Sequence, residues 1–399
     1  MVVHLGARLY ASLMTDSAAP DAIVEEQFAG EGTGVELETT DDDASPAREI
    51  EPWDPEKIRV STKSFSLRNV LDMIDADDLE LAPDFQRNRV WKARQKSRLI
   101  ESLLLQIPLP AFYFAEDADG LLRVVDGLQR LSTIHGFVRG QEFALDDLEY
   151  LEKDGSKFSD LEPALQRRLH NAQIVVHVID PSTPEEVKYD IFKRINTGGE
   201  PLNAMEVRHC MSRTRSRDFL KRCAASEAFQ TATGGVLKDH VRMQDREAAL
   251  RFCAFRMLGD ISNYDEYGSL ERLLDWAVRQ IDDNAALSDS QLAALFEDFE
   301  LAMNNATLVF GGHAFRKWPT TSERYSPINR ALFESWAVVL ADYDERSLTP
   351  IASAIVRKAR EVMTSDPNYI ASISSSTSDA RRVEMRFMVP RRLVSRLAS

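Results

Sequence analysis

The sequence is poor in several features that define large classes of protein. It has only three cysteines in 399 residues, Cys210, Cys223 and Cys253, and their spacing forms no metal-ligand pair. A disulfide-stabilised scaffold and a zinc finger are therefore excluded. No run approaches the roughly 20 apolar residues of a membrane-spanning helix, and residues 1–14 lack the apolar core of a secretory signal. We therefore expect a cytoplasmic protein with reduced thiols and no membrane partner.

Familiar catalytic motifs are absent as well. The sequence contains no Gly-x-x-x-x-Gly-Lys-Ser/Thr loop, no Cys-x-x-Cys pair and no Gly-x-Ser-x-Gly turn. A His-Asn-His nuclease needs histidines close together to bind its metal, yet only His313 follows His240. We therefore expect neither a P-loop NTPase nor a His-Asn-His nuclease module in this sequence.

The chain has fewer basic than acidic residues, and most of this imbalance lies in its N-terminal segment. The formal net charge is −15; residues 1–56 contain 14 acidic residues against Arg8 and Arg48, and the rest is nearly balanced at −3. We expect this acidic segment to be disordered, because it cannot bury enough apolar surface to offset its ordering entropy. A DNA-mimicking or autoinhibitory arm is the alternative. The balanced remainder leaves DNA binding open, since local basic patches decide that question.

The rest of the sequence divides into two parts by its periodicity. An α+β fold is predicted: an acidic tail at residues 1–56, an α/β domain at 57–203 and an all-α domain at 204–399. In the α/β domain, strands are predicted at 111–116, 121–125 and 172–179, and helices at 67–74, 94–106, 128–138, 161–170 and 185–195. In the second part, helices are predicted at 204–210, 217–226, 245–258, 269–281, 289–305, 328–343 and 349–363. Asn203 and Glu206 have the spacing of a capping box where this part begins.

One stretch of the α/β part combines a strand, a tight turn and a helix. The strand ends at Val125, Asp126 and Gly127 follow, and the helix occupies residues 128–138. Gly127 permits a sharp turn, while the start of the helix offers backbone amides and the positive end of a dipole. Together with the guanidinium of Arg130, these groups predict an anion site that suits a phosphate. Asp126 could hold a metal, orient a water or simply cap the helix.

Three motifs of the α/β part resemble the N-terminal domain family of the GmrSD restriction endonucleases. Residues 126–130, Asp-Gly-Leu-Gln-Arg, resemble the family's Asp-Gly-Gln-Gln-Arg signature and depart from it at Leu128. Residues 83–91 resemble its upstream motif, and residues 194–208 resemble its downstream motif. The family's fold is related to that of ParB and sulfiredoxin. The resemblance therefore implies a ParB/sulfiredoxin-like domain, in a stand-alone member without the C-terminal His-Asn-His nuclease.

The resemblance also implies an activity, namely nucleotide binding with slow NTP hydrolysis in defence against foreign or modified DNA. In this hypothesis Asp126 would hold Mg²⁺ or orient the attacking water, Gln129 would position phosphate or water, and Arg130 would neutralise the triphosphate. The residues implied to bind the nucleotide are Arg87, Gly127, Arg194, Asn196 and Arg208. Judged by residue chemistry alone, the arginines near residue 87 would instead form a solvated basic face.

Two further hypotheses use the same pocket differently. The domain could bind a DNA backbone phosphate without any chemistry and signal to a separate nuclease subunit. It could also cut DNA itself, which requires a second carboxylate beside Asp126, with Asp84 or Glu206 as the candidates. His135, on the helix that follows the central motif, is a further candidate for a catalytic base. The sequence thus favours an NTPase, keeps a non-enzymatic DNA sensor as the alternative and gives the least support to a nuclease.

Overall fold

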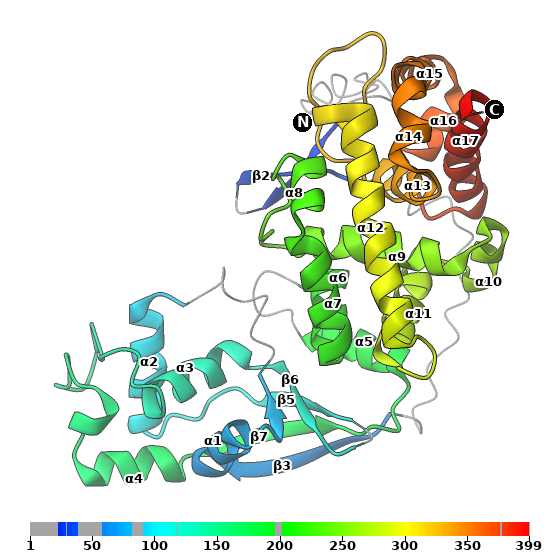
Figure 1. Ribbon diagram of the computed structural model, residues 1–399. Helices are drawn as coiled ribbons and strands as arrows, with labels where there is room; N and C mark the ends of the chain where they lie inside the picture. Colours follow the sequence, from blue (N-terminus) through cyan, green and yellow to red (C-terminus); the bar gives the residue numbers. More distant parts are fainter. Residues whose placement is uncertain are drawn as a thin grey trace, which may run out of the picture.

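A computed structural model of the chain describes residues 23–28, 30–38, 58–81, 91–117, 119–195, 202–375 and 377–398. A mixed five-stranded sheet with its helices is followed by a helical region (Figure 1). The predicted α+β fold class is therefore confirmed. The domain boundaries and the relation to the ParB/sulfiredoxin fold stay predictions.

The sheet has the spatial strand order β3-β7-β5-β6-β4. Its strands are β3 (Val60–Ser66), β4 (Leu79–Glu80), β5 (Phe112–Glu116), β6 (Leu122–Asp126) and β7 (Gln173–Ile179). The pairs β3–β7 and β5–β6 are antiparallel, whereas β7–β5 and β6–β4 are parallel. The β5–β6 pair is a hairpin formed by the two strands predicted at 111–116 and 121–125. It places β6 inside the sheet, between β5 and β4.

The helices of this part are α1 (Leu67–Asp75), α2 (Ala93–Leu104), α3 (Leu128–Val138), α4 (Pro163–Asn171) and α5 (Glu185–Ile195). They confirm the helices predicted at these positions. Leu131, Ile134 and Phe137 of α3 are fully buried, because residues three and four apart share one face of a helix. Helix α3 is therefore anchored in the core along its length, and its first turn is fixed where β6 ends.

The helical region is larger than the sheet domain. Its helices are α6 (Ala204–Met211), α7 (Thr214–Ala225), α8 (Glu227–Thr233), α9 (Gln244–Leu258), α10 (Tyr264–Tyr267), α11 (Leu270–Asp282), α12 (Asp289–Phe310), α13 (Arg330–Leu340), α14 (Glu345–Leu348), α15 (Ala352–Ser365), α16 (Pro367–Ser372) and α17 (Ala380–Ala398). Helix α13 is buried on all sides from Ala331 to Leu340 and packs against α9, α12 and α17. All the helices predicted for this region are present, whereas α8, α10, α14, α16 and α17 were not predicted. Within the described ranges, no helix has the length and apolarity that crossing a membrane takes.

The predicted capping box is present at the start of α6. The side-chain oxygen of Asn203 accepts the Glu206 N–H at 2.8 Å, and the Glu206 carboxylate accepts the Asn203 N–H at 2.7 Å. Asn203 also donates to the Arg242 carbonyl at 2.8 Å. The box therefore fixes both the beginning of α6 and its position against the rest of the helical region.

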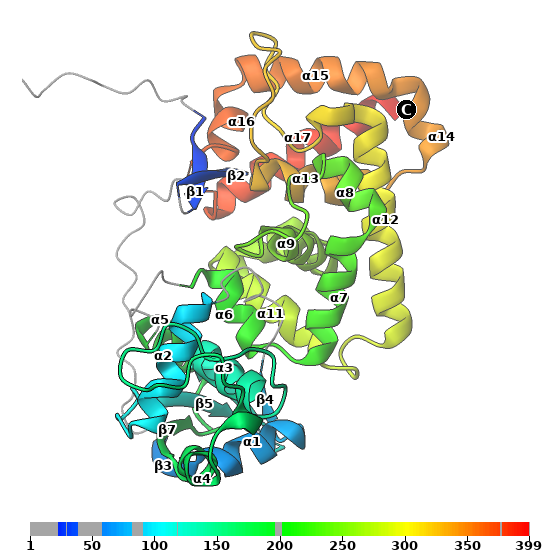
Figure 2. The ribbon, with the colours of Figure 1, turned by 90° about the vertical axis from the view of Figure 1, so that its left-hand side faces the viewer.

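A β-hairpin precedes the sheet domain in the chain and packs on the helical region (Figure 2). Its antiparallel strands are β1 (Glu25–Phe28) and β2 (Glu31–Glu36). These residues fall within the acidic segment that was expected to be disordered, and for them that expectation is wrong.

The hairpin is ordered because the helical region supplies partners for its side chains. The Glu26 carboxylate lies 2.8 Å from the Arg330 guanidinium, and the Glu36 carboxylate lies 2.6 Å from the Lys317 ammonium. Val35 is buried and forms a β-bridge with Ile328. The acidic residues therefore pair with positive charges that lie 281 and 304 positions later in the chain.

Candidate functional site

The junction between β6 and α3 is formed by Gly127, whose φ is +99°. A Cβ atom at this position would lie only 2.2 Å from a ring carbon of Phe112. Both the left-handed backbone and the lack of space therefore require glycine. As a result, α3 begins directly after the last residue of β6.

The first turn of α3 has no side-chain cap in the described part of the chain. Its leading backbone amides have no partner within the helix, because the first N–H groups of any α-helix lack an intrahelical acceptor. Asp126 does not cap them, since its carboxylate accepts a hydrogen bond from Arg130 at 2.7 Å. The alternative in which Asp126 serves as the helix cap is therefore wrong, and the junction keeps its donors for an anion.

Arg130 is held against Asp126 by several contacts. Its guanidinium donates to the carbonyls of Pro110 and Ala111 and lies 4.1 Å above the centre of the Phe112 ring. Burial lowers the pKa of Arg130, and the neighbouring Asp126 carboxylate opposes that shift. The Arg130 side chain is 12% exposed and that of Asp126 is 33% exposed. The Asp126 carboxylate is therefore partly exposed to solvent, and Arg130 fixes its position.

The structure brings four of the predicted site residues together and places others elsewhere. Asp126, Gly127, Gln129 and Arg130 all lie within the junction, where Gln129 is half-buried in the first turn of α3. Arg194 is exposed in the last turn of α5. Arg87 and Asn196 lie outside the described residues.

Arg208 makes its contacts with α11 and not with the junction. Its guanidinium pairs with Asp275 at 2.6 Å and with Glu271, and its side chain is only 4% exposed. Burial would lower the pKa of Arg208, but the two carboxylates raise it above its usual value. Arg208 therefore joins α6 to α11.

The described residues provide Asp126 with no protein-only metal site. In the described ranges no three His, Cys, Asp or Glu side chains lie together as a metal site would require. Glu206 is engaged in the capping box with Asn203, and Asp84 lies outside the described residues. A divalent ion at Asp126 would thus take its other oxygens from water and a phosphorylated ligand, as Mg²⁺ commonly does.

His135 lies away from the junction. It is seven residues after the start of α3, about 10 Å along the helix axis, and contacts the Asp75 carboxylate of α1 at 2.9 Å. These contacts tie α3 to α1. No junction residue forms a contact with His135 in the described chain.

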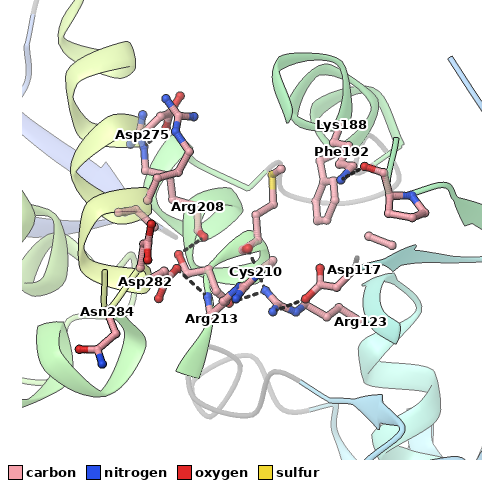
Figure 3. A pocket seen from close by; sticks show the side chains of 17 residues that line it. Asp117, Arg123, Lys188, Phe192, Arg208, Cys210, Arg213, Asp275, Asp282 and Asn284 are labelled. Carbon is pink, nitrogen blue, oxygen red and sulfur yellow. Dashed lines mark hydrogen bonds and ion pairs between the residues drawn. The ribbon is translucent and has the colours of Figure 1, made fainter. Parts of the chain in front are cut away.

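A separate cavity of about 800 Å³ lies between the sheet domain and the helical region (Figure 3). Arg123 and Lys188 line it from the sheet side, and Arg213 and Arg279 line it from the helical side. None of the four junction residues lines it. The sequence analysis missed this cavity because its walls come from segments that are far apart in the chain. One available signal was Arg123, a charged residue between the apolar residues Leu122 and Val124 of β6.

Arg123 links the two parts of the molecule at this cavity. Its guanidinium donates to the carbonyls of Met211 at 2.8 Å and Ser212 at 2.7 Å, and it pairs with Asp117 at 2.5 Å. Burial raises the pKa of Asp117, and Arg123 only partly offsets this rise. Strand β6 therefore carries the junction at its end and an anchor for the helical region three residues earlier.

The chain was compared with known protein families. Residues 67–211 match the family model of the GmrSD restriction endonuclease, N-terminal domain, which confirms the resemblance seen in the three motifs. Neither a curated protein nor a solved structure matches the chain. The matched stretch runs from the first residue of α1 to the last residue of α6, so it includes the β6–α3 junction. A domain of this family indicates a restriction-type role in defence. Residues 67–211 of the chain are thus similar to the N-terminal domain of the GmrSD restriction endonucleases.

Proposed function

We propose that the β6–α3 junction binds a nucleoside triphosphate with Mg²⁺ and hydrolyses it, as part of a restriction-type defence against foreign or modified DNA. The observation that carries this proposal is the uncapped start of α3 beside the partly exposed carboxylate of Asp126. Backbone amides and a helix dipole favour phosphate oxygens, and a carboxylate next to them favours the metal that accompanies a triphosphate.

The four junction residues have distinct roles in this proposal. Amides of the first turn of α3 bind phosphate oxygens, and Gly127 lets the ligand approach the backbone. Asp126 would hold Mg²⁺, which neutralises charge on the phosphates when it is bound. Arg130 fixes the Asp126 carboxylate and adds positive charge beneath it, while Gln129 orients the attacking water. Phosphoryl transfer needs little more than such positioning and charge neutralisation.

The remaining predicted contacts follow from the family motifs. We propose that Arg87, Arg194 and Asn196 complete the nucleotide site. Arg208 is left out of the phosphate contacts, because both Glu271 and Asp275 hold its guanidinium.

The test is phosphate release from ATP, GTP, CTP and UTP with Mg²⁺, with and without DNA. We expect turnover in the wild type and its loss in Asp126→Ala and Arg130→Ala. Arg94→Ala is the matched control, because Arg94 lies in the same domain but only in an exposed pair with Asp147. A folded wild type without turnover of any of the four nucleotides would reject the NTPase.

A second candidate function, DNA binding without hydrolysis, is favoured by the C-terminal helix α17. Arg381, Arg392 and Arg396 are exposed there, and their spacing of 11 and 4 residues places them on one face of the helix. Such a row suits a DNA backbone. We expect DNA retention on a filter to fall steeply with salt. In the triple variant Arg381→Ala/Arg392→Ala/Arg396→Ala both the retention and its salt dependence should decrease, whereas unchanged retention would remove α17 from the interface.

A further inference from the structure

We propose that the cavity between the sheet domain and the helical region is a second ligand site, which takes a nucleotide-sized molecule with a phosphate group. Its volume of about 800 Å³ lies within the usual range of small-molecule pockets, about 300–1,000 Å³. Because the four junction residues do not line it, this inference does not depend on hydrolysis at the junction.

The positive charges on the inner wall of the cavity are balanced by carboxylates of the protein. Arg123 is held by Asp117 and by two backbone carbonyls, and Arg208 is held by Asp275 (Figure 3). The guanidinium groups of Arg123 and Arg208 are thus already paired within the protein. They shape the cavity and leave ligand recognition to other side chains.

The outer part of the cavity carries two guanidinium groups that form no ion pair with a carboxylate of the described residues. Arg213 and Arg279 are exposed and line the cavity, and neither forms an ion pair with a described residue. The nearby Asp282 carboxylate is engaged, because it accepts the backbone N–H groups of Arg213 and Ser216, each at 2.9 Å. Two arginines on one cavity wall favour a phosphate, which can accept hydrogen bonds from both.

The rest of the lining favours a ring system over a bare anion. Phe192 and Val278 are buried apolar side chains of the wall, and Met211 also lines the cavity. Asp283 is exposed on the lining and offers an acceptor to the hydroxyl groups of a sugar. A ligand with a phosphate, a sugar and a ring system would match these three parts of the lining, and a nucleotide has all three.

The inference is tested by titrating the full chain with AMP, GMP, CMP and UMP in a calorimeter. We expect at least one of them to bind, and the double variant Arg213→Ala/Arg279→Ala to raise its Kd about tenfold or more, because two charge-assisted contacts are lost. Arg346→Ala/Arg357→Ala is the matched control, since it removes the same charge from exposed positions outside the cavity lining. This control and Asp126→Ala should leave the Kd unchanged.

Several results would overturn the inference. Absence of binding for all four monophosphates at millimolar concentration would do so, as would equal affinity in the wild type and in the Arg213→Ala/Arg279→Ala variant. Loss of binding in Asp126→Ala would move the ligand to the junction. Inorganic phosphate that binds as tightly as the best nucleotide would leave an anion site without recognition of the ring.

Discussion

Glu334 of α13 and Arg386 of α17 form an ion pair in which both side chains are completely buried. Arg251 of α9 approaches the same carboxylate at 3.2 Å. Burial raises the pKa of Glu334, although Arg386 and Arg251 act against this rise. The pair therefore fixes α17 to the centre of the helical region, and each partner depends on the other to offset its loss of hydration.

Removal of one partner is expected to be costly. Arg386→Met leaves the Glu334 carboxylate buried with less compensation, and we expect the free energy of unfolding to fall by about 3–5 kcal/mol. The double variant Glu334→Leu/Arg386→Met should lose less stability, because it removes the buried Glu334 carboxylate together with its partner. Urea unfolding of the three proteins measures both values. Equal losses in the single and double variants would contradict this account.

The stability of the protein is expected to depend on the charge of Glu38 in acidic solution. Burial would raise the pKa of this carboxyl, but Arg251 and Arg330 outweigh burial and lower the pKa from 4.5 to about 2. The folded state thus gains stability from the ionised carboxylate above about pH 4.5 and loses it as the pH falls towards 2. The fall in pKa corresponds to about 3 kcal/mol of folding free energy.

This pH dependence can be measured by thermal or urea unfolding between pH 7 and pH 2. Glu38→Gln should be less stable than the wild type at pH 7, and the difference should shrink below about pH 4.5. Glu31→Gln is the control, because Glu31 is exposed in β2, the strand that precedes Glu38. A difference that stays constant with pH would show that the Glu38 charge does not contribute.

Gly127 is expected to tolerate no side chain. Gly127→Ala adds a Cβ atom at 2.2 Å from the Phe112 ring to a backbone with positive φ, so it combines a clash with conformational strain. Gly120→Ala is the matched control, because Gly120 has a φ of +87° but no atom within 4 Å of the added Cβ. Gly120→Ala should cost about 1–2 kcal/mol from the backbone alone, and Gly127→Ala should cost more in the same unfolding assay. Similar costs would mean that Phe112 moves aside easily.

Arg123 is expected to be the main polar contact between the sheet domain and the helical region. Arg123→Met removes the bonds to Met211 and Ser212 and leaves Asp117 in a largely buried site without its partner. We expect a loss of about 3–5 kcal/mol in urea unfolding. Arg94→Met serves as the comparison, since its pair with Asp147 is exposed and worth about 1 kcal/mol or less. Comparable losses in the two variants would rule out a special role for Arg123.

Local sequence signals were sufficient for the strand and helix at the junction. The apolar residues Val124 and Val125, the turn residue Gly127 and the helical spacing of Leu131 and Ile134 act over short distances, so the sequence predicts β6 and α3 almost to the residue. The contacts of Arg130 with Pro110 and Ala111 depend on how β5 pairs with β6, and no local pattern encodes them.

Leu128 shows how the structure explains a departure from the family signature. The family commonly has glutamine at this position, whereas Leu128 is buried in the core of the sheet domain. An amide there would need a buried partner, while leucine needs none. The chain therefore uses this position for packing, and the polar groups of the junction come from Asp126 and Gln129.

The elements that the sequence analysis missed depend on distant partners. Hairpin β1–β2 looks unstructured in isolation, because its carboxylates lack counterions until the helical region supplies Lys317 and Arg330. Helix α17 is obscured by Pro390 and by its many arginines, and Arg386 is buried only through Glu334. The cavity likewise exists only after both parts of the chain have folded against each other.

The hairpin has a practical consequence for any shortened form of this protein. A chain that begins at residue 58 would keep every helix and strand of the sheet domain, but it would lack the carboxylates that hold Lys317 and Arg330. Ile328 would lose its cover by Val35, and its backbone would lose the hydrogen bonds that it forms with β2. Such a truncation would leave Lys317 without its carboxylate and Arg330 with only Glu247, beside newly exposed apolar surface. The hairpin must therefore be kept in any preparation meant to contain the intact helical region.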